Sequence, residues 1–167
     1  PLFGETLEDF LTEFKIFYIV RDPRDAMTSF WRFAGTGDGD LGPRTDSVDA
    51  FVRSAPSGQP LLFEHPPSTD MIARWCQHVG GWLPDMDSGA VKLVKYEDLL
   101  GNYDETLDGI ADHMATPPIH RLHPDPSLPG RTPWKSTSGI WRERMSVETE
   151  SYIGGIAGNL MFRLGYS

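Results

Sequence analysis

A short apolar run that leads directly into a helix-start signal constrains this chain more than any other feature. Residues 16–20, Ile-Phe-Tyr-Ile-Val, are rich in β-branched and aromatic side chains, as buried parallel strands are. Asp22 then offers a helix N-cap, Pro23 suits the first helical position, and Asp25 adds a negative charge to the first turn. A strand that feeds a helix N-terminus, with the helix running to about Phe33, is typical of α/β domains.

The remaining periodicity continues this alternation of strands and helices. It predicts a second strand over residues 91–96 and helices over residues 48–52, 68–82, 103–114 and 147–164. Strands that alternate with helices favour a parallel sheet, here within one domain over residues 1–167. Two visible strands are few for such a sheet, so we expect the chain to be incomplete at its N-terminus.

Composition narrows the possible partners. The formal net charge of −9 argues against broad nucleic-acid binding, which needs a basic surface, but leaves room for a local basic pocket. No apolar run approaches the ~20 residues of a membrane helix, so we expect no membrane partner. Cys76 is the single cysteine, which excludes an internal disulfide and fits a reducing compartment. The expected location is cytoplasmic.

The end of the first strand is the place where a phosphate could bind. Ligands of open α/β sheets bind beyond the carboxyl ends of the strands, at helix N-termini. Arg21 stands at this position, and Ser29, eight residues later, points to roughly the same side. Together they could hold one phosphate. The residues alone leave an alternative, in which Arg21 pairs with Asp25 and Ser29 faces solvent.

Residues 16–33 resemble the 3′-phosphate-binding segment of sulfotransferases that use 3′-phosphoadenosine 5′-phosphosulfate (PAPS). That segment has an apolar strand, then Arg-(Asn/Asp)-Pro-(Lys/Arg)-Asp, then a Ser eight residues after the Arg, and every position matches. The resemblance implies a P-loop-NTPase-like parallel sheet flanked by helices, of the sulfotransferase type. It also implies PAPS as donor, 3′-phosphoadenosine 5′-phosphate (PAP) as product, and no metal ion. Carried over, Arg21 and Ser29 bind the donor's 3′-phosphate, and Phe33 approaches the acceptor pocket.

Two further segments resemble the same family. Residues 75–82 are similar to its Trp-x-x-His-Val-x-x-Trp helix, which implies that His78 borders the acceptor pocket. Residues 93–99 are similar to its Tyr-Glu-Asp strand end, which implies that Tyr96 contacts the adenine. The implied reaction moves a sulfuryl group to a hydroxyl or amine of a small-molecule acceptor.

A late segment, residues 135–142, resembles in part the family's Arg-Lys-Gly-x-x-Gly-x-Trp loop, which closes over the nucleotide. Trp134 stands where the family has Arg, and Arg131 or Arg142 could supply that charge. The resemblance implies nucleotide contacts from Lys135, Ser136, Gly139, Trp141 and Arg142.

Other expected parts of the family pattern have no match. The family's first strand with its 5′-phosphosulfate loop is absent, and its general base precedes the strand that starts here. We therefore interpret the chain either as the C-terminal part of a sulfotransferase or as a catalytically inactive nucleotide-binding module. His78 is the candidate base, with pocket lining and structural packing as alternatives. A P-loop kinase is a third class, but no Walker loop is present. His120 and His123 lack a third ligand for a metal.

Overall fold

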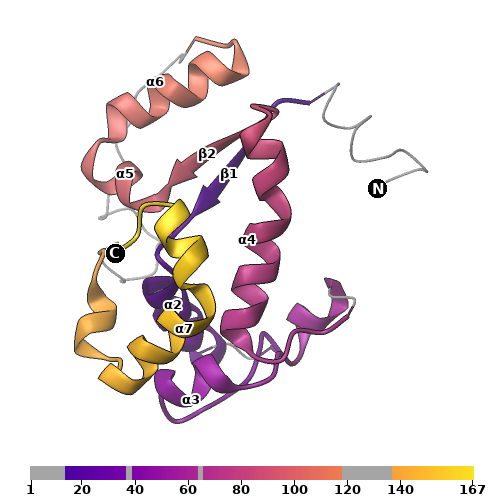
Figure 1. Cartoon of the computed structure of the whole chain (residues 1–167), viewed down its shortest axis with the longest axis vertical. Helices are drawn as coiled ribbons and strands as arrows, with labels where there is room; N and C mark the ends of the chain where they lie inside the picture. The colour runs from indigo at the N-terminus through magenta and orange to yellow at the C-terminus, as the bar shows by residue number, and fades with distance from the viewer. Residues whose placement is uncertain (1–13, 37–38, 64–65, 118–136) are drawn as a thin grey trace. The chain divides into compact units, whose positions relative to one another are not determined.

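The computed structural model describes residues 14–36, 39–63, 66–117 and 137–167 (Figure 1). By contact, the chain divides into two compact units. The first unit comprises residues 1–20 and 82–137, and the second comprises residues 21–81 and 138–167. The single domain expected over residues 1–167 stays a prediction.

A parallel pair of strands forms the sheet of the first unit. Strand β1 (Ile16–Val20) pairs with β2 (Val91–Lys95), with Ile16 opposite Val91 and Val20 opposite Lys95. Both strands fall where the apolar runs predict them. Val20, the last residue of β1, and Val91, the first residue of β2, are each 2% exposed. This small sheet therefore contributes to the apolar core.

Two helices follow β2 in the first unit. Helix α6 (Tyr103–Met114) has the predicted bounds and lies alongside β2 in Figure 1. His113 on this helix donates a hydrogen bond from Nε2 to the carbonyl oxygen of Ile16, 2.8 Å away, which ties α6 to the start of β1. The short helix α5 (Tyr96–Gly101), directly after β2, was not predicted.

The second unit is helical, and side-chain caps start two of its helices. In α3 (Val48–Arg53), Ser47 accepts a hydrogen bond from the amide of Ala50 at 3.2 Å. In α7 (Val147–Arg163), Ser146 accepts one from the amide of Thr149 at 3.2 Å. Both helices lie where the periodicity predicts them. Helix α2 (Pro23–Thr36) begins as predicted and extends three residues beyond Phe33. The unit also holds the 3-10 helices η2 (Gln59–Phe63) and η3 (Ile140–Glu143).

Helix α4 (Met71–Asp87) runs further than its sequence predicts. Asp70 caps it by accepting the amide hydrogen of Ala73 at 2.8 Å. The predicted end at Trp82 is wrong, because the helix continues through Pro84. Proline removes one backbone donor from a helix interior. Within the first unit, the ring of Trp82 packs against that of Tyr18 with centroids 5.7 Å apart, which anchors the last turns of the helix.

The core of the second unit comes from side chains at helical spacing on α2, α3, α4 and α7. Its buried members include Met27, Phe51, Val52, Met71, Ile72, Val79, Ile153 and Ala157. Residues 72, 75 and 79 are buried as the amphipathic pattern predicts. Ile156 departs from the pattern, since 40% of its surface is exposed.

Two features are absent from the described part of the chain. No helix there is long and apolar enough to cross a membrane. Within the same residues, no group of three or more His, Cys, Asp or Glu side chains is arranged to hold a metal ion.

Candidate nucleotide-binding site

The N-terminal turn of α2 is the centre of the candidate site. Asp22 caps this helix, because its Oδ1 accepts the amide hydrogen of Arg24 at 2.9 Å. Thr28, one turn later, is fully buried and donates its hydroxyl to the carbonyl oxygen of Arg24 at 2.8 Å. This turn is therefore held at both ends by short-range hydrogen bonds that the sequence itself dictates.

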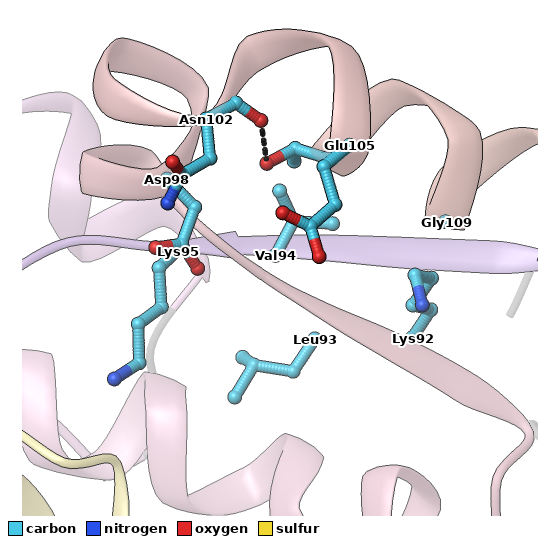
Figure 2. A pocket seen from close by; sticks show the side chains of 9 residues that line it. Lys92, Leu93, Val94, Lys95, Asp98, Asn102, Glu105 and Gly109 are labelled. Atoms are coloured by element: carbon cyan, nitrogen blue, oxygen red, sulfur yellow. Dashed lines mark hydrogen bonds between the residues drawn. The ribbon is translucent and has the colours of Figure 1, made fainter.

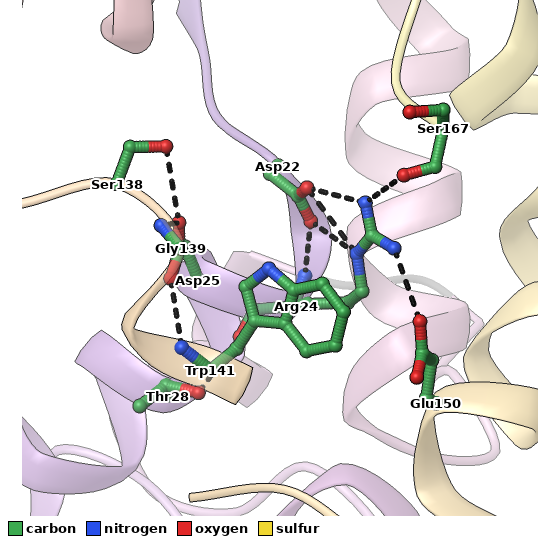
Figure 3. A network of polar contacts seen from close by, with 9 residues as sticks. All are labelled: Asp22, Arg24, Asp25, Thr28, Ser138, Gly139, Trp141, Glu150 and Ser167. Atoms are coloured by element: carbon green, nitrogen blue, oxygen red, sulfur yellow. Dashed lines mark hydrogen bonds and ion pairs between the residues drawn. The ribbon is translucent and has the colours of Figure 1, made fainter. Parts of the chain in front are cut away.

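Arg24 is buried in a network of acceptors (Figure 3). Its Nε lies 2.9 and 3.2 Å from the two carboxylate oxygens of Asp22, and its Nη2 lies 2.7 Å from Oδ2. Nη2 also donates to the carbonyl oxygen of Ser167 at 2.6 Å, and Nη1 lies 3.5 Å from Glu150 of α7. Arg24 and Asp22 are only 5% and 7% exposed, so each neutralises a charge that burial would otherwise make costly.

The charge of Arg24 is secured by these neighbours. Burial acts to lower the pKa of Arg24, but the hydrogen bond with Asp22 and the negative charges of Asp22, Glu150 and Asp25 raise this pKa above its ordinary value. The guanidinium carbon lies 4.2 Å from the ring centroid of Trp141, where a cation is attracted by the indole face. The permanent cation thus contributes to holding Trp141 against α2.

Asp25 joins the first turn of α2 to a distant segment of the chain (Figure 3). Its Oδ2 accepts the amide hydrogen of Gly139 at 2.5 Å, and its Oδ1 accepts that of Trp141 at 3.2 Å. The hydroxyl of Ser138 lies 3.5 Å from Oδ2. Asp25 is 0% exposed, so these donors replace the water that the carboxylate loses on burial. The sequence left open an alternative in which Asp25 pairs with Arg21. The donors found here come from residues 138, 139 and 141 instead.

The segment that binds Asp25 is a tight turn followed by η3. Gly139 has a φ of 83°, a left-handed backbone that favours glycine. A Cβ at this position would lie 2.7 Å from Nη1 of Arg142. The guanidinium carbon of Arg142 lies 4.5 Å from the ring centroid of Trp141, so Arg142 folds back over the turn. We call residues 138–142 the late turn.

The structure brings two of the predicted segments together. The late turn, which carries Gly139, Trp141 and Arg142, is bonded to the helix that carries Ser29. Ser29 is exposed on α2, and Arg21 is half-buried just before it. The sequence did not predict the roles of Asp22, Arg24 and Asp25 in this contact. Two acids around an arginine at a helix start are the signal that could have suggested such a network.

The other predicted site residues lie elsewhere or outside the described residues. Phe33 on α2 is 58% exposed, and His78 is exposed on α4. Tyr96 is half-buried at the first position of α5, in the first unit. Lys135 and Ser136 lie outside the described residues.

A separate hollow of about 280 Å³ lies in the first unit, beside β2 and α6 (Figure 2). A Cβ at Gly109 would lie 3.3 Å from Nζ of Lys92, so the glycine leaves room for this cation. Glu105 extends from α6 toward the hollow. The hollow mixes two lysines with two acids and has no aromatic side chain for a base to stack on. Its lining residues are Lys92, Leu93, Val94, Lys95, Asp98, Asn102, Glu105, Thr106 and Gly109.

Comparison with known proteins identifies relatives of this chain. A family model described as a sulfotransferase domain matches residues 6–121. Sulfotransferase 2A1 from Rattus norvegicus is 27% identical over 124 residues, which cover 74% of this chain and 37% of the rat protein. The chain therefore spans well under half of the length of this relative.

A solved structure shares the fold. The crystal structure of mouse sulfotransferase SULT7A1 complexed with PAP superimposes with a TM-score of 0.61 at 17% sequence identity. The match covers 88% of this chain and 58% of the mouse chain. The expected α/β fold with a parallel sheet is confirmed by this similarity.

Proposed function

Because this chain belongs to the sulfotransferase domain family, we propose that it carries the part of a PAPS site that binds the 3′-phosphate and the adenine. The complete protein transfers the sulfuryl group of PAPS to a hydroxyl or amine of a small-molecule acceptor and releases PAP. The mouse structure is a complex with PAP, which supports the same nucleotide here.

One observation carries this proposal: Asp25 binds the backbone of the late turn, 114 and 116 residues away in the sequence. The resemblance assigns the 3′-phosphate to the α2 segment and the covering of the nucleotide to the late turn. The Asp25 contact brings these two segments together within one unit, as a shared ligand requires.

The electrostatics of α2 are compatible with a phosphate, although acids stand near Arg21. Asp22 is paired with Arg24, and Asp25 is engaged by backbone amides of the late turn. Their negative charges are therefore balanced locally, and the helix N-terminus adds a positive dipole end. The resemblance assigns the 3′-phosphate to Arg21 and Ser29, and it assigns a contact with the adenine to Tyr96.

The chemistry of transfer divides among the remaining residues. The bond between sulfur and the bridging oxygen of the donor breaks, and a bond to the acceptor oxygen or nitrogen forms. The acceptor's proton passes to a base, a role that we assign to His78 on the exposed face of α4. The resemblance assigns Phe33 to the lining of the acceptor pocket. The late turn, with Lys135 and Ser136 before it, covers the nucleotide.

Calorimetric titration of this chain tests the nucleotide site. We expect PAP to bind more tightly than adenosine 5′-phosphate (AMP), which lacks the 3′-phosphate. In the Arg21→Ala variant, PAP binding should weaken by about 1.5–3 kcal/mol, as expected for the loss of hydrogen bonds to a charged group.

Arg44→Ala is the matched control for this titration. Arg44 is exposed and donates to the carbonyl oxygen of Gly39, outside the candidate site, so its loss should leave PAP affinity unchanged. Equal affinities of the unmodified, folded chain for PAP and AMP would contradict the proposed function.

A further inference from the structure

Asp25 occupies a position whose importance the family resemblance does not explain. The resemblance gives the 3′-phosphate to Arg21 and Ser29, and Asp25 lies midway between them, four residues from each. A buried carboxylate beside a phosphate site is unfavourable unless its charge is engaged. Asp25 therefore needs a structural reason to lie there, and its hydrogen bonds supply one.

We propose that Asp25 is a positioning residue, which fixes the late turn beside α2 so that Arg142 completes the 3′-phosphate site. This inference rests on the proposed function. Asp25 itself does not touch the nucleotide, because its two carboxylate oxygens are occupied by the amides of Gly139 and Trp141.

Helix geometry places the late turn near Ser29. Residues four apart on a helix project from the same face, with Cβ atoms about 6 Å apart. Asp25 and Ser29 have this spacing on α2, so the carboxylate that binds the late turn lies one helical turn before the serine. A phosphate held by Ser29 is thus within reach of long side chains from the late turn.

The donors that the late turn offers are the right ones for a dianion. The side chain of Arg142 is exposed, whereas Trp141 is 5% exposed and anchors the turn. The hydroxyl of Ser138 donates to Asp25 and so belongs to the contact that holds the turn. Arg142 is held over the indole of Trp141, so its guanidinium is positioned before any ligand arrives. Trp134 stands where the family has its phosphate-binding arginine, and Arg142 supplies that charge from within the late turn.

The turn geometry that Asp25 stabilises also restricts residue 139 to glycine. Gly139 has a positive φ and lies against Nη1 of Arg142. The Gly139→Ala substitution would strain the backbone and displace this guanidinium while leaving the Asp25 carboxylate intact. It therefore disturbs the proposed arrangement from the opposite side of the contact.

The test compares Asp25→Asn with Asp49→Asn by calorimetry and by hydrogen exchange of the full chain. Asp49 is a matched control because it also accepts a backbone amide hydrogen across the fold, from Ser146 at 3.0 Å, but lies outside the proposed site. In Asp25→Asn, the amide group replaces one acceptor with a donor that faces backbone N–H groups. We expect residues 138–142 to exchange faster and PAP affinity to fall about tenfold, equivalent to ~1.4 kcal/mol.

The preference for PAP over AMP distinguishes a positioning role of Asp25 from a general loss of stability. Asp25→Asn should weaken PAP and leave AMP affinity nearly unchanged, so the preference for PAP shrinks; Asp49→Asn should retain it. A folded Asp25→Asn chain with unaltered exchange in residues 138–142, or with an unaltered preference for PAP, would overturn the proposal.

Two further outcomes remain decisive. If Asp25→Asn does not fold, Gly139→Ala decides the question: loss of the PAP preference supports the inference, and full retention overturns it. If the unmodified chain binds PAP and AMP equally well, the proposed function is wrong, and so is the proposed contribution of the late turn to a 3′-phosphate site. The exchange of residues 138–142 still decides whether Asp25 positions the late turn.

Discussion

Three acidic residues of this chain, Asp22, Asp25 and Asp49, have the same carboxylate but different partners. Asp22 pairs with a guanidinium two residues away, whereas Asp25 and Asp49 accept backbone amide hydrogens from segments that are far away in the sequence. For Asp49, burial raises the pKa. The hydrogen bonds from Ser146 and Thr149 and the charge of Arg53 lower it by more, so the pKa lies below its ordinary value. The partner, and not the residue type, decides what each acid does.

Cys76 leads to a prediction at the scale of a single residue. Burial, with the charge of Asp70 as a second cause, raises the pKa of the Cys76 thiol to about 11. Only the thiolate reacts with alkylating agents, and a raised pKa lowers the thiolate fraction at a given pH. At pH 8 about one thiol in a thousand should therefore be ionised.

Iodoacetamide labelling as a function of pH measures this fraction. The rate should keep rising up to about pH 11 while the protein stays folded, and the unfolded chain provides the control. A rate that levels off near pH 9 in the folded protein would contradict the shift.

At the scale of elements, local sequence signals predict most helices and both strands, whereas α5 and the last turns of α4 were not predicted. The strands and helices α3, α6 and α7 follow from periodicity, and serine side chains cap α3 and α7. Helix α5 was missed because Glu97 and Asp98 were interpreted as the end of a strand, whereas acids in a first turn also favour a helix N-terminus. Helix α4 passes Pro84, which sequence rules treat as a stop.

Two glycines should respond in opposite directions to substitution by alanine. Gly81 is exposed within α4, and a Cβ there would have no neighbour within 4 Å, so Gly81→Ala should stabilise the protein by about 0.5–1 kcal/mol. Gly58 has a φ of 67°, and its Cβ would clash with the carbonyl oxygen of Asp40. Gly58→Ala should therefore destabilise it.

Urea denaturation of both variants measures these effects. Gly155→Ala in α7 is a further control, since its Cβ would also meet nothing within 4 Å. A loss of stability in Gly81→Ala would show that α4 does not hold a regular helix at this point.

At the scale of the whole molecule, the family is assigned although the chain spans only 37% of its rat relative and 58% of its mouse structural relative. The family model matches residues 6–121, which include the resembling segments 16–33, 75–82 and 93–99.

Thermal melting with nucleotide tests the site in the intact chain. A ligand at about 100 times its Kd, bound only by the folded state, adds ~2.7 kcal/mol to stability. For a chain of this size, PAP should then raise the Tm by roughly 5–10 °C. AMP at the same concentration is the control and should raise it less. No shift with PAP at a concentration that saturates the site in calorimetry would contradict binding to the folded state.

The sequence by itself determined both strands and the helix start at Asp22, because these depend on local signals, and it determined the α/β class and the family through the order of such segments along the chain. It also placed Arg21, Ser29 and the late turn as candidates, through their resemblance to family segments. Only the tertiary structure decided that Asp25 binds Gly139 and Trp141, and that Arg24 packs on the indole. The physical reason is that a buried carboxylate or guanidinium must find partners, and packing alone determines which distant groups come within hydrogen-bonding reach.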